Sequence, residues 1–133
     1  MCNLMFQLEV KWLAPTETDH DNATAYIRYD NFAIGGEETG YVLKSLGAYS
    51  GEAGDSMSES VGHMFTTWDR DNDNWLGYNC AREMGGGWWY SNCGKSNLNG
   101  PYVEDFGLTW HTWRKFKSIK ATEMMIRRKS IIL

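Results

Sequence analysis

Glycine and aromatic residues set the layout of this sequence. Fourteen glycines interrupt 133 residues, and nineteen residues are aromatic, seven of them tryptophan. Glycine breaks regular structure, whereas Trp, Tyr and Phe bury large areas where their rings pack together. The sequence therefore predicts a chain that turns often and packs rings, with few and short helices.

Five segments have the composition of β-strands, each bounded by Gly, Asp, Asn or Ser. They are residues 4–13, 23–34, 41–49, 63–68 and 118–128. In the second segment Ala25, Ile27 and Tyr29 alternate with polar or amphipathic residues, so that one face can be buried while the other meets water. The small residues of 50–62 predict a loop.

Length and composition indicate one soluble globular domain over residues 1–133. The chain is 42% hydrophobic and 23% charged, and no repeat or linker divides it. No stretch approaches the roughly 20 uncharged apolar residues of a spanning helix, so no membrane span is predicted. The first seven residues show neither the basic region nor the long apolar region of a signal peptide.

The charge distribution disfavours a nucleic-acid partner. The net charge is −4, whereas nucleic-acid binders normally carry a basic surplus. Residues 111–133 are nevertheless basic, with seven Lys or Arg against Glu123 alone. Apolar residues such as Phe116 and Ile126 interleave with these charges, which favours a solvated strand face over a polyanion site.

Three cysteines leave one without a partner in the chain. Cys80 and Cys93 are 13 residues apart, and a bridge between them would remove roughly 3 kcal/mol of unfolded-chain entropy. We therefore predict that bridge. Zinc is a weak alternative for these cysteines, because no C-x-x-C pair or matched His spacing is present. A disulfide needs an oxidising compartment, and the sequon at Asn22 agrees with secretion and glycosylation. Cys2 then either pairs outside the chain or is a free thiol.

An acidic run carries the most informative chemistry. Asp69, Asp71 and Asp73 alternate with other residues over 69–73, and carboxylates so close together suit a hard divalent cation such as Ca²⁺. An EF-hand is excluded, because its loop needs Gly at position 6 and Glu at position 12, where this chain has Asn74 and Cys80. We favour a calcium loop of another kind over a solvated acidic turn.

A series of motifs around this run resembles one family. Residues 69–73 (DRDND), 79–81 (NCA), 86–90 (GGWWY), Cys93 and 96–100 (SNLNG) follow one another in nearly the family order and spacing. The match extends to 49–57 (YSGEAGDSM) and 122–127 (TEMMIR). The sequence is similar to the fibrinogen C-terminal domain family over residues 6–128.

The resemblance implies a partial fibrinogen C-terminal-like fold. This is an α+β fold, mostly antiparallel β-sheet with short helices and long loops. The chain would lack the amino-terminal part of the family's domain, with its first cysteine pair. The resemblance further implies an extracellular, secreted, non-enzymatic recognition module, although no signal peptide is visible.

The resemblance also assigns site residues. The side chains of Asp71 and Asp73 and the carbonyls of Trp75 and Gly77 would hold Ca²⁺, with Asp69 outside the first coordination shell. Cys80 and Cys93 match a disulfide of the family. In relatives the peptide before the second cysteine is often cis and lines a ligand pocket.

The pocket itself departs from the family pattern. Met84 occupies the position of an aromatic residue, and Gly94 that of a histidine. The segment after the SNLNG motif is also short. The candidate ligand pocket consists of Met84, Asn92, Cys93, Gly94 and Phe116, and a methionine can still contact a methyl group.

Two functions follow as expectations. The first is a calcium-binding, lectin-like module with an innate-immune or adhesive role, which binds acetylated glycans or an extracellular protein and forms oligomers through an upstream region or Cys2. The second is a structural remnant without a working pocket. An enzyme is not expected, because the GDS block at 54–56 lacks the Asp-x-x-His pair that would activate Ser56.

Overall fold

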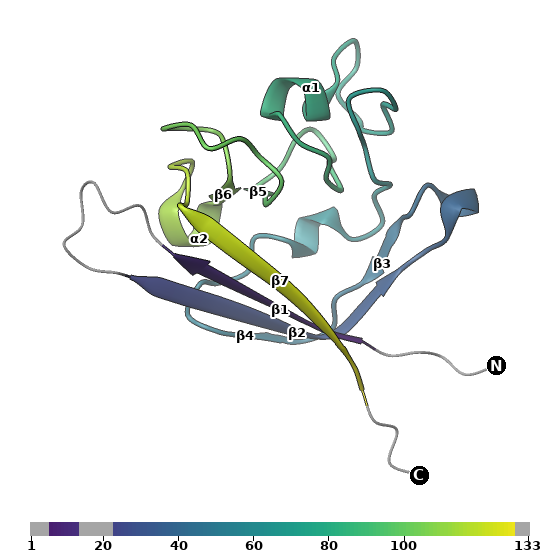
Figure 1. Cartoon of the computed structure of the whole chain (residues 1–133). Helices are drawn as coiled ribbons and strands as arrows, with labels where there is room; N and C mark the ends of the chain where they lie inside the picture. The colour runs from purple at the N-terminus through teal and green to yellow at the C-terminus, as the bar shows by residue number, and fades with distance from the viewer. Residues whose placement is uncertain (1–5, 14–22, 130–133) are drawn as a thin grey trace.

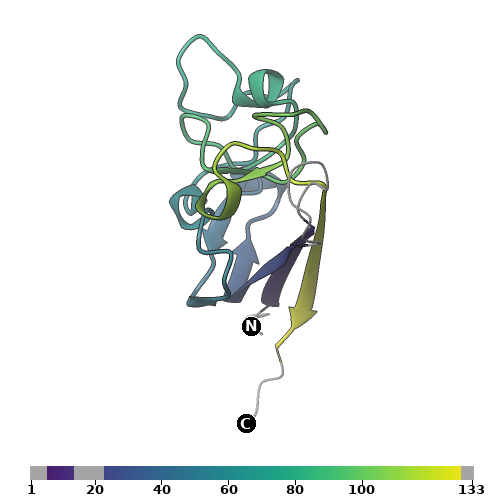
Figure 2. The ribbon, with the colours of Figure 1, turned by 90° about the vertical axis from the view of Figure 1, so that its left-hand side faces the viewer.

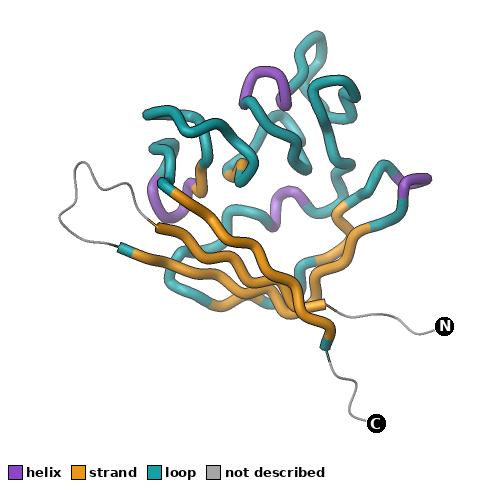
Figure 3. Tube along the Cα trace, in the orientation of Figure 1, coloured by secondary structure: helices purple, strands orange, loops and turns teal. Residues whose placement is uncertain are grey.

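The structure, a computed structural model, describes residues 6–13 and 23–129. Its strands are β1 (Phe6–Leu13), β2 (Thr24–Ile34), β3 (Leu43–Ser45), β4 (Tyr49–Ser50), β5 (Ser96–Asn97), β6 (Thr109–Trp110) and β7 (Ala121–Arg128). Its helices are α1 (Cys80–Met84) and α2 (His111–Arg114), with 3₁₀ turns η1 (Glu37–Thr39) and η2 (Ser58–Ser60). Strands dominate one side of the molecule and loops the other (Figure 3).

Five strands form an antiparallel sheet in the order β3-β2-β1-β7, with β4 also paired to β2. Leu8, Val10 and Trp12 of β1 stand opposite buried residues of β2, namely Tyr29, Ile27 and Ala25. Directly opposite residues share a face of the sheet. These six side chains therefore define the inner face, which is apolar and carries the main core.

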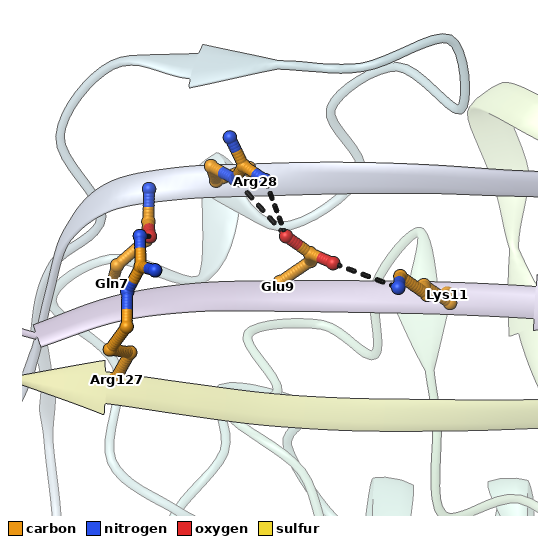
Figure 4. Close-up of polar contacts among 5 residues, drawn as sticks. All are labelled: Gln7, Glu9, Lys11, Arg28 and Arg127. Carbon is orange, nitrogen blue, oxygen red and sulfur yellow. Dashed lines mark hydrogen bonds and ion pairs between the residues drawn. The ribbon is translucent and has the colours of Figure 1, made fainter.

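The opposite, outer face of the sheet is polar (Figure 4). Arg28 donates to the Glu9 carboxylate at 2.7 Å, and the Lys11 ammonium lies 3.2 Å from the same group. The hydrogen bond from Arg28 holds the pKa of Glu9 below its ordinary value. Alternation of apolar and polar residues along β1 and β2 thus produces the two faces of the sheet.

A loop layer, residues 51–120, covers the inner face (Figures 1 and 2). The Trp12 ring packs 4.8 Å from that of Trp110, and Phe32 meets Trp89 edge to face. Trp88, Tyr90 and Ile119 of this layer are also buried. The core is therefore shared between sheet side chains and large rings carried by loops.

Side-chain hydrogen bonds to the main chain hold the loop layer together. The indole nitrogen of Trp110 donates to Gly54 O at 2.8 Å, and Asn97 donates to Met84 O at 3.0 Å. The indole of Trp89 donates to the carbonyl of Tyr41 at 2.8 Å. Buried loop carbonyls need partners of this kind, because few regular ladders supply them here.

A close backbone approach fixes one glycine at the border between sheet and loop layer. Gly51 follows β4 with φ of +135°, and a Cβ there would lie 2.3 Å from the carbonyl oxygen of Tyr26. Any side chain would displace the backbone of β2.

The structure corrects two predicted strands. Residues 63–68 form no strand and make single bridges at Thr66 and Thr67, because the Asn79 and Arg82 side chains occupy the carbonyls of Thr67 and Trp68. Residues 41–49 divide into β3 and the start of β4, with left-handed Gly47 between them. The first, second and last predicted strands are present as β1, β2 and β7.

None of the helices in the described residues has both the length and the apolar character that a membrane crossing needs.

Candidate functional site

The acidic loop of residues 69–79 is closed at its base by Asn79. The side chain of Asn79 accepts hydrogen bonds from the N–H groups of Ala81 and Arg82 and so caps α1. Its amide nitrogen donates to the carbonyl of Thr67 at 3.0 Å. One side chain therefore ties the end of the loop to the residues before it.

Asp71 and Asp73 make successive turns within the loop. Asp71 Oδ1 accepts from the Asp73 N–H at 3.3 Å, and Asp73 Oδ1 accepts from the Trp75 N–H at 2.9 Å. Asp73 Oδ2 accepts from the Cys80 N–H at 2.7 Å. The Asp73 carboxylate thus points toward the start of α1. Burial raises the pKa of the Tyr90 hydroxyl, and the Asp73 charge adds to that rise.

A hollow of about 340 Å³ opens beside this loop. Asp71 and Gly77 line it together with Asp69, while Asp73 and Trp75 are not among its lining residues. Trp75 instead stacks on Tyr78 with ring centroids 4.6 Å apart. The structure therefore gathers two of the four expected calcium residues around one hollow.

The donors fit calcium by their chemistry. Carboxylate and main-chain carbonyl oxygens are the ligands that Ca²⁺ prefers. In the described residues no group of three or more His, Cys, Asp or Glu side chains could hold a metal ion. A calcium site here would therefore need main-chain carbonyls beside the Asp71 and Asp73 carboxylates.

Cys80 and Cys93 form a disulfide, as the sequence predicts. Cys80 is the buried first residue of α1, and its sulfur accepts the Cys93 N–H at 2.9 Å. The peptide before Cys93, which is often cis in relatives, is trans here, since the described residues contain no cis bond. The chain reverses instead through Cys93 at φ of +54°, with the Ser91 N–H donating to the Cys93 carbonyl.

The candidate pocket residues lie on segments that the disulfide and β5 connect. Met84 is the last residue of α1, the helix that begins at Cys80. Asn92 and Gly94 are the neighbours of Cys93, the other bridged cysteine. Phe116 comes after α2 and stacks on Phe106 at 5.0 Å. These contacts hold each segment in place. They do not show whether the five side chains bind one ligand, so the pocket stays a prediction.

A hollow of about 710 Å³ was not anticipated from the sequence. Tyr41, Phe65 and Trp89 supply its aromatic wall, and Asp69 and Arg70 lie among its lining residues. These residues come from separate segments, so no local sequence pattern predicts the hollow.

The GDS block has a structural part. Asp55 Oδ1 accepts from the Tyr29 hydroxyl at 2.5 Å and from the Met57 and Ser58 N–H groups at 3.0 Å each. Burial acts to raise the pKa of Asp55, but these hydrogen bonds outweigh it and lower the pKa below its ordinary value. Burial and the Asp55 charge together raise the pKa of Tyr29.

Ser56, the block's hydroxyl, is buried and bonded to Thr112. The two hydroxyl oxygens are 2.7 Å apart, and Ser56 Oγ also accepts the Thr112 N–H at 2.9 Å. This arrangement joins the segment before η2 to α2 rather than activating a nucleophile.

Two further predictions, on Cys2 and the Asn22 sequon, lie outside the described residues.

The comparison with protein families decides the classification. Residues 8–129 match the family model described as fibrinogen beta and gamma chains, C-terminal globular domain. The chain belongs to this family. The family's globular domain is a non-enzymatic, typically ligand-binding recognition module, which agrees with the interpretation of the sequence.

Curated relatives extend beyond this chain. It is 41% identical to bovine (Bos taurus) fibrinogen-like protein 1 in an alignment of 133 positions, which covers 86% of this chain and 42% of that protein. It is 45% identical to fibrinogen C domain-containing protein 1 of Macaca fascicularis in an alignment of 121 positions, which covers 82% of this chain and 28% of the relative. The chain thus spans less than half the length of these relatives.

Solved structures share the fold. The fibrinogen-like globe domain of human ANGPTL6 matches with a TM-score of 0.85 and 33% identity, over 97% of this chain and 59% of that one. A lamprey fibrin D-dimer complexed with the peptide Gly-His-Arg-Pro-amide matches with a TM-score of 0.76 and 28% identity, over 91% and 44% of the two chains. The fold prediction, a partial fibrinogen-like globe, is confirmed.

Proposed function

We propose that this chain is part of an extracellular recognition module that binds Ca²⁺ in the loop of residues 69–79. It uses the segments beside the Cys80–Cys93 bridge to bind an acetylated glycan or a protein surface. The observation that carries the proposal is the match of residues 8–129 to a family of ligand-binding globes. The Asp71 and Asp73 carboxylates each accept from the N–H two residues further on, and Asp73 also accepts from the N–H of Cys80, the first residue of α1. These contacts support the proposal of bound calcium.

The physical argument for calcium is electrostatic. Three carboxylates in five residues repel one another, and a divalent cation converts this repulsion into attraction. Asp71 and Asp73 would provide side-chain oxygens, and Trp75 and Gly77 main-chain oxygens. Gly77 is exposed and lines the same hollow as Asp71. Bound calcium would hold the loop against α1 and the bridge.

Thermal unfolding in a calcium titration tests the metal. A ligand that binds only the folded state stabilises it by about 2.7 kcal/mol at one hundred times its Kd, so the midpoint should rise with calcium. Asp71→Asn should abolish that rise. Asp69→Asn is the matched control, because it removes one carboxylate from the same loop but not from the proposed ligands. An equal calcium response in both variants, or none in the unmodified chain, contradicts the proposal.

Retention on acetylated ligands tests recognition. We expect the chain to bind immobilised acetylated albumin or N-acetylglucosamine in calcium and to elute with a chelator. Met84→Gln should weaken retention, since a polar amide replaces the thioether that would contact the acetyl methyl. Met64→Gln is the control, because Met64 is exposed and remote from the candidate pocket in sequence.

The second candidate function, a structural remnant, follows from the altered pocket positions Met84 and Gly94. It predicts no retention on acetylated ligands or protein ligands. The midpoint of thermal unfolding would still rise with calcium. The two experiments therefore separate loss of the pocket from loss of the metal site.

A further inference from the structure

The segment after α1 is held in place by Asn99, which follows β5. The Asn99 amide nitrogen donates to the Gly87 carbonyl at 2.9 Å. The Asn99 backbone also lies against Gly86, where an added Cβ would overlap the Asn99 carbonyl group. Residue 99 therefore fixes the two glycines that lead from α1 to the buried Trp88. Helix α1 lies on the side of the loop layer away from the sheet (Figures 1 and 2).

Position 100 needs glycine for a separate reason. A Cβ at Gly100 would overlap the carbonyl group of Gly107, which is main chain and cannot move aside as a flexible side chain would. The fold thus uses an amide donor at position 99 and a residue without a side chain at position 100. Asn99 is the only asparagine in the sequence that glycine follows.

Asparagine followed by glycine is a chemically labile pair. The backbone nitrogen of the second residue can attack the side-chain carbonyl carbon of the asparagine, and glycine has no Cβ to hinder the approach. The Gly100 N–H donates to no acceptor among the described residues, so no hydrogen bond competes for this nitrogen. Asn99 is exposed, which gives water access to the reacting groups.

We propose that Asn99 is a deamidation site and that its conversion releases residues 85–87 from residue 99. Gly100 N bonds to Asn99 Cγ, and the Cγ–Nδ2 bond breaks. The Gly100 proton passes through water to the departing nitrogen, which leaves as ammonia. Water then opens the cyclic imide at either carbonyl carbon and gives aspartate or isoaspartate at position 99. Neither calcium nor a ligand takes part, so the proposal is independent of the proposed function.

The hydrogen bond to Gly87 controls the rate of this reaction. While the Asn99 amide donates to Gly87, it cannot turn toward its own main chain, and ring closure requires that turn. The contact must therefore open first. Local opening of this kind costs less free energy than global unfolding. The reaction should be slower in the folded chain than in the unfolded chain, but it should not require complete unfolding.

Both products remove the contact. Ionised aspartate at position 99 has no donor for the Gly87 carbonyl and brings a negative charge beside it. Isoaspartate also lengthens the main chain by one carbon, at the point where Gly86 already lies against the Asn99 backbone. The Tyr90 hydroxyl, which donates to the Gly86 carbonyl at 2.7 Å, would then hold this segment without the help of residue 99. We expect the loosening to be local to residues 85–89.

Peptide mapping of the aged chain tests the reaction. The full chain is incubated at mildly alkaline pH, and mass spectrometry follows the replacement of NH2 by OH at each asparagine. Conversion at Asn99 should outpace that at every other asparagine, and an isoaspartyl methyltransferase should label residue 99. Unfolding in urea should accelerate it by about fivefold or more, the factor that one net hydrogen bond represents. Asn97, which is buried and followed by Leu98, is the control and should stay unmodified in the folded chain.

Hydrogen exchange tests the consequence. Asn99→Asp should accelerate exchange at residues 85–89 by about fivefold or more. Asn92→Asp, which adds the same charge at an exposed position, is the matched control and should leave that segment unchanged. The aged unmutated chain should show the same acceleration, so the test stands even where the variant fails to fold. Conversion at Asn99 no faster than at Asn97, equal rates in folded and unfolded chains, or unchanged exchange after conversion would overturn the proposal.

Discussion

The sheet and the loop layer are stabilised in different ways. In the sheet, backbone ladders run along β1, β2 and β7, and alternating side chains such as Ile27 supply the buried face. In the loop layer the regular elements have two to five residues, and side chains such as Trp110, Asn97 and Asn79 bind main-chain groups. A periodic pattern therefore specifies the first region, and individual contacts specify the second.

The largest effect should come from the core of the sheet. Ile27→Ala should lower the free energy of unfolding by about 2–5 kcal/mol, because removal of this fully buried side chain leaves a cavity between the sheet and the loop layer. Tyr26→Ala, on the outer face, should cost under about 1 kcal/mol. Denaturant unfolding measures both. Equal losses would contradict the assignment of the two faces.

Reducing the Cys80–Cys93 bridge should act on the loop layer. We expect a loss of roughly 3 kcal/mol, because the unfolded chain gains the entropy of a loop that the bridge had closed. Hydrogen exchange should speed up most around α1 and residues 91–97, with β1 and β2 less affected. A Cys2→Ser variant treated in the same way controls for the third thiol. Uniform acceleration along the chain would show that the two regions unfold as one.

The smallest effect should come from the contact between the two regions. Asp55→Asn should cost roughly 1–2 kcal/mol at neutral pH, because Asp55 accepts from Tyr29 of the sheet and from Met57 and Ser58 of the loop layer. Glu52→Gln, which removes an exposed carboxylate nearby, is the control and should cost almost nothing.

The Asp55 contact should also depend on pH. Since the folded-state pKa of Asp55 is lowered, its stabilisation is fully present above the unfolded pKa, near 4, and is lost as the pH falls through the lower folded value. Unfolding measured from pH 7 down to about pH 2 should show the gap between wild type and Asp55→Asn closing in acid. A constant gap would contradict this.

The sequence was informative wherever local order carried the signal. Alternation at Ala25, Ile27 and Tyr29 predicted β2 and its buried face, and the spacing of Cys80 and Cys93 predicted the bridge. Motif order predicted the family. The single-domain boundaries, the calcium residues and the ligand pocket stay predictions.

Residues 63–68 show where local reasoning fails. Their composition is that of a strand, but Asn79 and Arg82 take the carbonyls of Thr67 and Trp68 that a neighbouring strand would have used. Residues 41–49 fail for a related reason, because Gly47 turns the chain between β3 and β4. In both cases a contact or turn outside the strand pattern decided the backbone conformation.

The sequence by itself determined the strands with a period of two, the bridged cysteines and the family, because each can be recognised from the order and spacing of residues along the chain. Only the tertiary structure decided the burial of Trp110 and the bonding of Ser56 to Thr112. These features depend on contacts between segments far apart in the chain, and the local spacing of residues does not predict such contacts.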